Sequence, residues 1–179
     1  EKKNIFLTGC PSIDILKNDK SKISKKLKTK INSTKTDGYI NLDNDYLILM
    51  QHPVTTEYLD AKRQITETIK AVKILISKGI QILWLWPNID AGSDFFSKEI
   101  RRFREKNKNL KNILFYKNFS PEEYACILKN SSCILGNSSS GIREASYLGI
   151  PCVNIGNRQS FRERGKNVLD VDYSSNKIV

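Results

Sequence analysis

The chain has 179 residues, of which 39% are hydrophobic and 27% charged, and its formal net charge is +11. This length predicts a single domain with a buried core, and the apolar runs are too short to cross a bilayer. The basic residues gather in segments 17–36 and 98–111, without a known nucleic-acid motif or regularly interleaved aromatic side chains. We therefore expect a solvated basic surface and no nucleic-acid or membrane partner. A basic nucleic-acid-binding module stays as an alternative.

The cysteine and histidine content argues against a disulfide framework and a metal site. The four cysteines are scattered without a CxxC pair, and three of them lie in or beside apolar runs. This pattern is typical of reduced, buried thiols, and the absence of a signal-peptide pattern adds to the expectation of a cytoplasmic protein. His52 is the single histidine, which rules out a site with several histidine ligands. We expect neither a metal nor a cofactor.

The first half of the chain is predicted to contain two strands and one long helix. A short apolar strand is expected at 4–7. The lysine-rich stretch 17–36 is weakly periodic and predicts one or two short helices, followed by a turn at 37–38. The run 46–50 lacks the alternation of a half-exposed strand and therefore predicts a buried one. Apolar residues at helical spacing predict a helix that begins at residue 58 and ends just before Gly79.

The second half alternates between strands and helices. Ser120, Pro121 and Glu123 form a capping-box pattern with proline at the first helical position, which predicts a helix through residue 128. Further helices are expected at 93–103 and 141–148. Strands are expected at 80–86, 112–116, 133–135, 152–155 and 167–171.

Continuous apolar strands that alternate with helices are typical of a parallel sheet covered by helices on both faces. The predicted fold class is therefore α/β: residues 1–179 form one Rossmann-like, three-layer lobe with a parallel sheet. In such folds ligands bind beyond the carboxyl ends of the strands. The loops that follow the strands are thus the candidate binding segments.

The loop after the strand at 133–135 has the most informative chemistry. Its sequence, GNSSSGIRE at 136–144, places glycines and three consecutive serines between a strand and a helix. The first N–H groups of a helix lack intrahelical partners and carry partial positive charge. The three consecutive serines, Ser138–Ser140, are therefore predicted to line a cradle for a phosphate, and Gly136 and Gly141 to let the ligand approach the backbone.

Polar residues at neighbouring strand ends each have two interpretations. His52 donates a hydrogen bond to a phosphate or acts as an acid near neutral pH, or else it is a histidine at a helix N-terminus. Glu144 accepts hydrogen bonds from a ribose diol, or it is a carboxylate favoured by the helix dipole. Arg158 offers a planar fork to a phosphate or is a surface arginine, and Asn88 is by itself a turn residue.

Six segments together carry a family resemblance. They are TGCPS at 8–12, QHPVTT at 51–56, WPNIDAGS at 86–93, GNSSSGIRE at 136–144, NIGNRQ at 154–159 and RERGKNV at 162–168. In this order they resemble the C-terminal lobe of the hydrolysing UDP-N-acetylglucosamine 2-epimerases, over nearly the whole chain except the lysine-rich stretch. The cradle and the segment NRQSFRE at 157–163 are similar to the hydrolysing rather than the non-hydrolysing branch.

The resemblance implies a UDP site in this lobe. Ser138 and Ser139 match the diphosphate-binding serines of the family, with Gly141 beside them in the cradle. Glu144 matches the ribose-binding glutamate, and Arg158 matches an arginine of the UDP site.

Three further residues take their roles from the same resemblance. His52 matches the family histidine that faces the phosphates, and it is the one catalytic residue expected in this chain. Asn88 matches an asparagine of the nucleotide site. Asn118 aligns with a position that can be histidine in relatives, and we include it among the UDP-binding residues.

The resemblance also implies a glycosyltransferase-B-like architecture, in which two Rossmann-like domains hold a UDP-sugar between them. The N-terminal domain, with the carboxylates that handle the C2 proton of the sugar, would lie outside this chain. The implied reaction is elimination of UDP and hydration to N-acetylmannosamine or a related 2-epimer, in sialic-acid-type sugar biosynthesis, by a homo-oligomer. This lobe alone is expected to be inactive. The nucleotide-binding domain of a UDP-sugar glycosyltransferase is the alternative.

Overall fold

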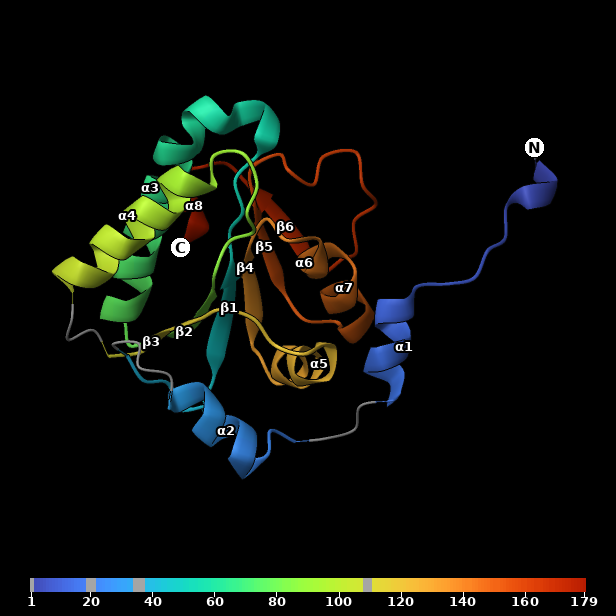
Figure 1. Ribbon diagram of the computed structural model, residues 1–179, viewed down its shortest axis with the longest axis horizontal. Helices are drawn as coiled ribbons and strands as arrows, with labels where there is room; N and C mark the ends of the chain where they lie inside the picture. The colour runs from blue at the N-terminus through green and yellow to red at the C-terminus, as the bar shows by residue number, and fades with distance from the viewer. Residues whose placement is uncertain (1, 19–21, 34–37, 108–110) are drawn as a thin grey trace.

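A computed structural model describes residues 2–18, 22–33, 38–107 and 111–179. At its centre lies a six-stranded sheet in the order β3-β2-β1-β4-β5-β6 (Figure 1). The strands are β1 (Tyr46–Met50), β2 (Gln81–Leu85), β3 (Ile113–Tyr116), β4 (Cys133–Gly136), β5 (Cys152–Ile155) and β6 (Val168–Val171). Each neighbouring pair is parallel, so the predicted α/β class is confirmed.

The strand order reverses beside β1. This strand pairs with β2, the next strand in sequence, on one side and with β4 on the other. In a doubly wound sheet such a reversal opens a crevice beyond the carboxyl ends of the two central strands, and ligands bind there. The segments that follow Met50 and Gly136 therefore lie at the switch point of this sheet.

Helices cover both faces of the sheet (Figure 1). One face carries α3 (Ala61–Ser77), α4 (Ser93–Lys106) and α8 (Ser175–Ile178), and the other carries α1 (Pro11–Asn18), α2 (Lys25–Asn32), α5 (Pro121–Lys129), α6 (Ser139–Ile142) and α7 (Glu144–Leu148). Because side chains alternate along a strand, Ile48 packs into the core under α2 and α5, whereas Leu49 packs under α3 and α4. No helix in the described ranges is long and apolar enough to cross a bilayer.

Several predicted helices are present with shifted bounds. The helix predicted from residue 58 begins at Ala61, because Thr55–Asp60 wind into a 3-10 helix, η2. Its end is as predicted, with Gly79 in the left-handed region just beyond it. The helix predicted at 93–103 continues to Lys106. The lysine-rich stretch contains α2, whereas the turn expected at 37–38 involves Asp37, which lies outside the described residues.

The capping box predicted before β4 is present, whereas the helix predicted after β4 is interrupted. The capping box is confirmed, because Ser120 Oγ accepts the N–H of Glu123 and the Glu123 carboxylate accepts the N–H of Ser120. The single helix predicted at 141–148 is wrong in detail. The backbone of Arg143, at φ −112° and ψ −76°, divides it into α6 and α7.

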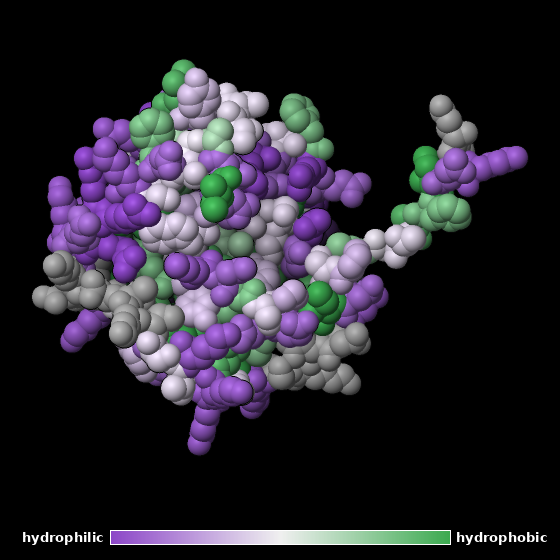
Figure 2. Space-filling view, in the orientation of Figure 1, coloured by the Kyte–Doolittle hydropathy of each residue, from purple (hydrophilic) through white to green (hydrophobic). Residues whose placement is uncertain are grey.

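The strand predicted at 4–7 is wrong. Lys2–Asn4 form a short 3-10 helix, η1, and the segment after it runs away from the body of the protein (Figures 1 and 2). Ile5, Phe6 and Leu7 are 77, 78 and 103% exposed. A strand needs a neighbour to accept and donate its backbone hydrogen bonds, and no strand of the described chain pairs with this segment.

Candidate functional site

Asn137 joins the two loops at the switch point. Its N–H donates to the carbonyl of Met50 at 3.0 Å, its Oδ1 accepts the N–H of His52 at 2.8 Å, and its Nδ2 donates to the carbonyl of His52 at 2.8 Å. The preceding residue must be glycine, because a Cβ on Gly136 would stand 2.1 Å from the Met50 carbonyl oxygen at φ +130°. The loops after β1 and β4 are thus held in one arrangement.

The imidazole of His52 is neutral and its tautomer is fixed. Nδ1 accepts the backbone N–H of Asn88 at 3.1 Å, so the ring proton is on Nε2. Burial, then the charge of Arg158, lowers the pKa of His52 to about 4, while Asp90 acts in the opposite direction. At neutral pH His52 is therefore a hydrogen-bond donor through Nε2. Of the two functional interpretations, this geometry favours the phosphate donor over the acid.

This burial predicts a pH dependence of stability. Because the folded pKa of about 4 lies below the ordinary value of 6.5, the unfolded chain binds more protons between these two values. The free energy of unfolding should therefore rise by about 3 kcal/mol as the pH increases from about 4 to 6.5, and then level off. A His52→Gln variant should lack this component, which comparison of unfolding midpoints across that range measures. An imidazole NMR signal that titrates near pH 6.5 in the folded protein would overturn the assignment.

The three serines of the cradle have different roles. Ser138 caps α6, and its Oγ accepts the N–H of Ser140 at 3.3 Å, which leaves the Ser138 hydroxyl proton able to donate. The Ser140 hydroxyl is buried and bonded to the Tyr124 hydroxyl at 2.6 Å. Ser139, half-buried, begins the helix, and its N–H has no intrahelical partner. Ser138 and Ser139 are thus the two serines that the structure leaves available to an anion.

Gly141 serves packing between α6 and the sheet. A Cβ at this position would stand 2.4 Å from Cys152 Sγ on β5, and its N–H donates to the Ser138 carbonyl at 3.1 Å. Its predicted contact with the ligand stays a prediction. The absence of a side chain is already required by the fold.

Glu144 is a buried carboxylate with an unsatisfied oxygen. The residue is 8% exposed, and its Oε2 has no hydrogen-bond partner. Oε1 lies 3.6 Å from the guanidinium of Arg143, whose side chain is half exposed. A buried carboxylate oxygen without a partner costs free energy unless a ligand donates to it. The position, at the start of α7 beside the cradle, therefore favours the interpretation as a ligand contact.

The loop after β5 is hydrogen-bonded to the backbone carbonyl of Asn137. Gln159 Nε2 donates to the Asn137 carbonyl at 2.7 Å, and Arg158 Nη1 donates to it at 3.3 Å. The other end of the Arg158 guanidinium lies 3.8 Å from the Asp90 carboxylate, in the loop after β2. The sequence had indicated Arg158 but neither Gln159 nor Asn137 as organising residues. Three strand ends therefore meet around Asn137.

The two asparagines predicted to bind UDP, Asn88 and Asn118, lie outside the group of residues around Asn137. Asn88 contributes its backbone N–H to His52, and its side chain is exposed. Asn118 follows the edge strand β3, and its Oδ1 accepts the N–H of the adjacent Phe119 at 2.9 Å. β3 is separated from β1 by β2. The structure therefore gathers His52, Ser138, Ser139, Glu144 and Arg158 at the switch point, with Asn88 beside them and Asn118 away from them.

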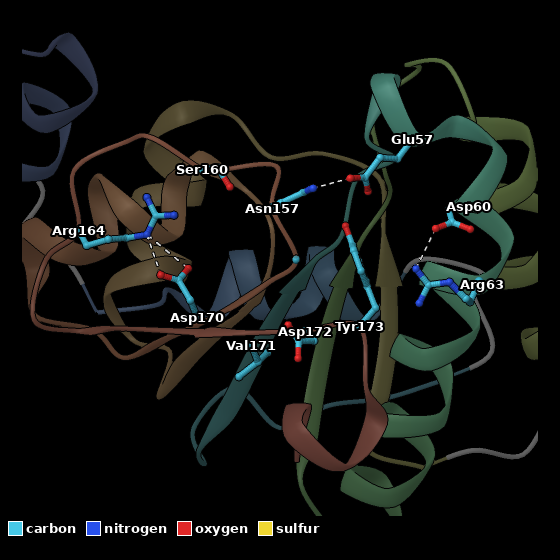
Figure 3. A pocket seen from close by; sticks show the side chains of 11 residues that line it. Glu57, Asp60, Arg63, Asn157, Ser160, Arg164, Asp170, Val171, Asp172 and Tyr173 are labelled. Atoms are coloured by element: carbon cyan, nitrogen blue, oxygen red, sulfur yellow. Dashed lines mark hydrogen bonds and ion pairs between the residues drawn. The ribbon is translucent and has the colours of Figure 1, made fainter.

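Two hollows flank the loop that carries Arg158. The first, of about 610 Å³, is lined by Glu57, Arg63, Asn157, Arg164, Asp170 and Tyr173 among others (Figure 3). Its arginines pair with acidic residues of the same hollow, as the dashed lines in Figure 3 show. The second, of about 690 Å³, is lined by Thr55, Thr56, Asp90, Arg158 and Phe161 among others. Among the described residues, no cluster of His, Cys, Asp and Glu could hold a metal ion.

Comparison with known proteins gives one family. Residues 1–179 match the family model of UDP-N-acetylglucosamine 2-epimerase. The chain is 28% identical to the UDP-N-acetylglucosamine 2-epimerase of Neisseria meningitidis over 99% of its own length and 43% of that protein. It is 31% identical to the UDP-N,N'-diacetylbacillosamine 2-epimerase (hydrolyzing) of Legionella pneumophila, over 100% of its length and 44% of that protein.

Among solved structures, the Methanocaldococcus jannaschii UDP-GlcNAc 2-epimerase in complex with UDP-GlcNAc and UDP is similar with a TM-score of 0.62 and 19% identity. The match covers 99% of this chain and 46% of that one. This likeness supports the fold, and the chain spans less than half the length of each relative. By its match over all 179 residues, the chain belongs to the UDP-N-acetylglucosamine 2-epimerase family.

Proposed function

We propose that this chain is the UDP-binding half of a hydrolysing UDP-sugar 2-epimerase. The observation that carries the proposal is Glu144, a buried carboxylate with an unpartnered oxygen beside a cradle of serine hydroxyls. A ribose diol would donate to this carboxylate, and a diphosphate would accept from Ser138, Ser139 and Arg158. A nucleoside diphosphate therefore suits both groups at once.

In the proposed reaction the bond between C1 of the sugar and the UDP oxygen breaks while C2 loses a proton. The unsaturated sugar then takes up water and gives N-acetylmannosamine or a related 2-epimer, a precursor for sialic-acid-type sugars. Negative charge would grow on the β-phosphate as UDP leaves, and in this proposal the Arg158 guanidinium and the Nε2–H of His52 stabilise it. The similarity to the Legionella enzyme, a hydrolyzing 2-epimerase, supports this branch of the family.

We assign removal of the C2 proton to a part of the protein that these 179 residues do not include. By the family resemblance, the base that removes the C2 proton belongs to a preceding Rossmann-like domain, and the relatives are more than twice as long as this chain. We propose that the complete protein is a homo-oligomer in the cytoplasm. The cysteine thiols, of which those of Cys126 and Cys152 are buried, are compatible with a reducing compartment.

The proposal is tested by ligand binding to this chain. Calorimetry and thermal unfolding should show binding of UDP, weaker binding of UMP, which lacks the β-phosphate, and weaker binding of pyrophosphate, which lacks the ribose. At UDP concentrations of about 100 times Kd, the free energy of unfolding should rise by about 2.7 kcal/mol. The isolated chain should release no UDP from UDP-N-acetylglucosamine. Salt-sensitive retention of an oligonucleotide without any stabilisation by UDP would favour the nucleic-acid alternative instead.

A further inference from the structure

Phe161 has an unfavourable backbone conformation. Its φ is +63°, and Asn112 is the only other non-glycine residue with positive φ in the described ranges. Asparagine tolerates the left-handed region because its short side chain can bond locally, whereas a bulky aromatic residue there is an outlier. This conformation costs free energy that glycine at the same position would not cost.

Packing within the chain does not offset that cost. Phe161 is 108% exposed, so it gains almost no packing against the rest of the protein. An exposed aromatic side chain on a strained backbone contributes nothing to folding. Such outliers persist at ligand contacts, where the side chain has a function outside the fold.

The loop around Phe161 is fixed at both sides of the crevice. Asn157 Nδ2 donates to Glu57 Oε1, in η2 on the opposite side of the first hollow (Figure 3). The Asn157 carbonyl accepts the N–H of Ser160 at 2.8 Å, and Gln159 is bonded to the carbonyl of Asn137. The backbone that carries Phe161 is therefore held relative to the cradle.

The second hollow has the lining that a sugar requires. Thr55, Thr56 and Asp90 offer polar partners for hydroxyl groups, and Phe161 offers an apolar ring to a face of C–H groups. Sites for small ligands combine such an apolar wall with a few polar side chains. The volume of about 690 Å³ lies within the usual range for such sites.

Arg158 sets the direction in which a nucleotide sugar would lie. Its guanidinium is bonded to the cradle carbonyl of Asn137, and it also lines the second hollow. If the ribose binds at Glu144 and the diphosphate lies between the cradle and Arg158, the shared residue Arg158 would direct the group on the far phosphate toward this hollow. We propose that Phe161 contacts the sugar ring of the UDP-sugar and selects sugars with an apolar face or acyl substituent. This inference rests on the proposed function.

Saturation-transfer NMR of the 179-residue chain with UDP-N-acetylglucosamine tests the contact. Irradiation of the protein should saturate both the uracil protons and the sugar-ring and acetyl protons. In Phe161→Gly the ratio of sugar to uracil saturation should fall about twofold or more, whereas Phe161→Tyr should retain it. Leu59→Ala is the matched control, because Leu59 is 83% exposed but does not line this hollow. Its ratio should equal that of the wild type.

The outcomes separate the two proposals. Uracil saturation with an unchanged sugar ratio in Phe161→Gly would overturn the role of Phe161 alone. No uracil saturation in the wild type would overturn the UDP site and this inference with it. The strain has its own test, because Phe161→Gly should melt about 2–4 °C above Phe161→Ala. Equal melting temperatures would show that the left-handed backbone is not a cost, and would remove the first step of the argument.

Discussion

Replacement of Glu144 by glutamine is expected to weaken UDP binding about tenfold or more and to leave the melting temperature unchanged or higher. Hydrogen bonds to a charged group contribute about 1.5–3 kcal/mol, and the ribose diol would lose its ionised acceptor. In the free protein, however, Glu144 Oε2 is buried without a partner, so the loss of the charge removes a desolvation cost. Calorimetric titration with UDP, combined with thermal unfolding of the free protein, measures both effects.

Two controls make this expectation specific for the ribose. Glu122→Gln changes an exposed acidic residue in the first turn of α5, away from the cradle, and should leave UDP affinity unchanged. With 2′-deoxy-UDP, the wild type should already bind more weakly, and Glu144→Gln should cost less further affinity than it costs with UDP. An equal loss for the two nucleotides would show that Glu144 acts through general electrostatics, without a bond to the 2′-hydroxyl.

Gly141→Ala is expected to lower the free energy of unfolding by about 1–3 kcal/mol, as overpacking of a close contact does. The added Cβ would meet Cys152 Sγ at 2.4 Å, whereas its next neighbours, at 3.5 and 3.6 Å, are at ordinary contact distance. Removal of the thiol should therefore relieve the clash. The double variant Gly141→Ala/Cys152→Ala should be more stable than the sum of the single effects predicts, which a double-mutant cycle in urea measures.

The control for this cycle is Gly149→Ala. Gly149 lies in the left-handed region just after α7, at φ +71°, and an added Cβ would meet nothing within 4 Å. Its cost comes from the backbone alone, so Cys152→Ala should not reduce it. The double variant at positions 141 and 152 should also bind UDP as the wild type does. Simple additivity at 141 and 152 would contradict the packing role, and lost UDP affinity in the double variant would support a ligand contact at Gly141.

The parts of the fold that local sequence determines were predictable. The capping box at Ser120 and the left-handed Gly79 after α3 depend on residues within one or two turns, and both are present as expected. The buried strand at 46–50 was recognisable because an uninterrupted apolar run suits a sheet covered on both faces. The same reasoning failed at 4–7, because an apolar run forms a strand only where a neighbour exists to pair with it.

The site was predictable as a set of loops but not as a set of contacts. Serines and glycines between a strand and a helix indicated the cradle. The bonds between Asn137 and His52, however, join residues 85 apart in the chain, and no spacing rule relates them. Burial likewise favours one interpretation of His52 and of Glu144 over the others, and burial follows from how all the elements pack. The family resemblance supplied the roles that such residues have in relatives.

The bonds around Asn137 have a consequence for how a ligand is received. The side-chain amide and the backbone carbonyl of Asn137 connect the ends of β1, β4 and β5. Groups already fixed in place lose little conformational entropy when a ligand arrives, so association needs no slow rearrangement of these three loops. The lobe is in this sense a preassembled receptor. The proposed nucleotide site would therefore suit proteins in which a different second domain decides the chemistry.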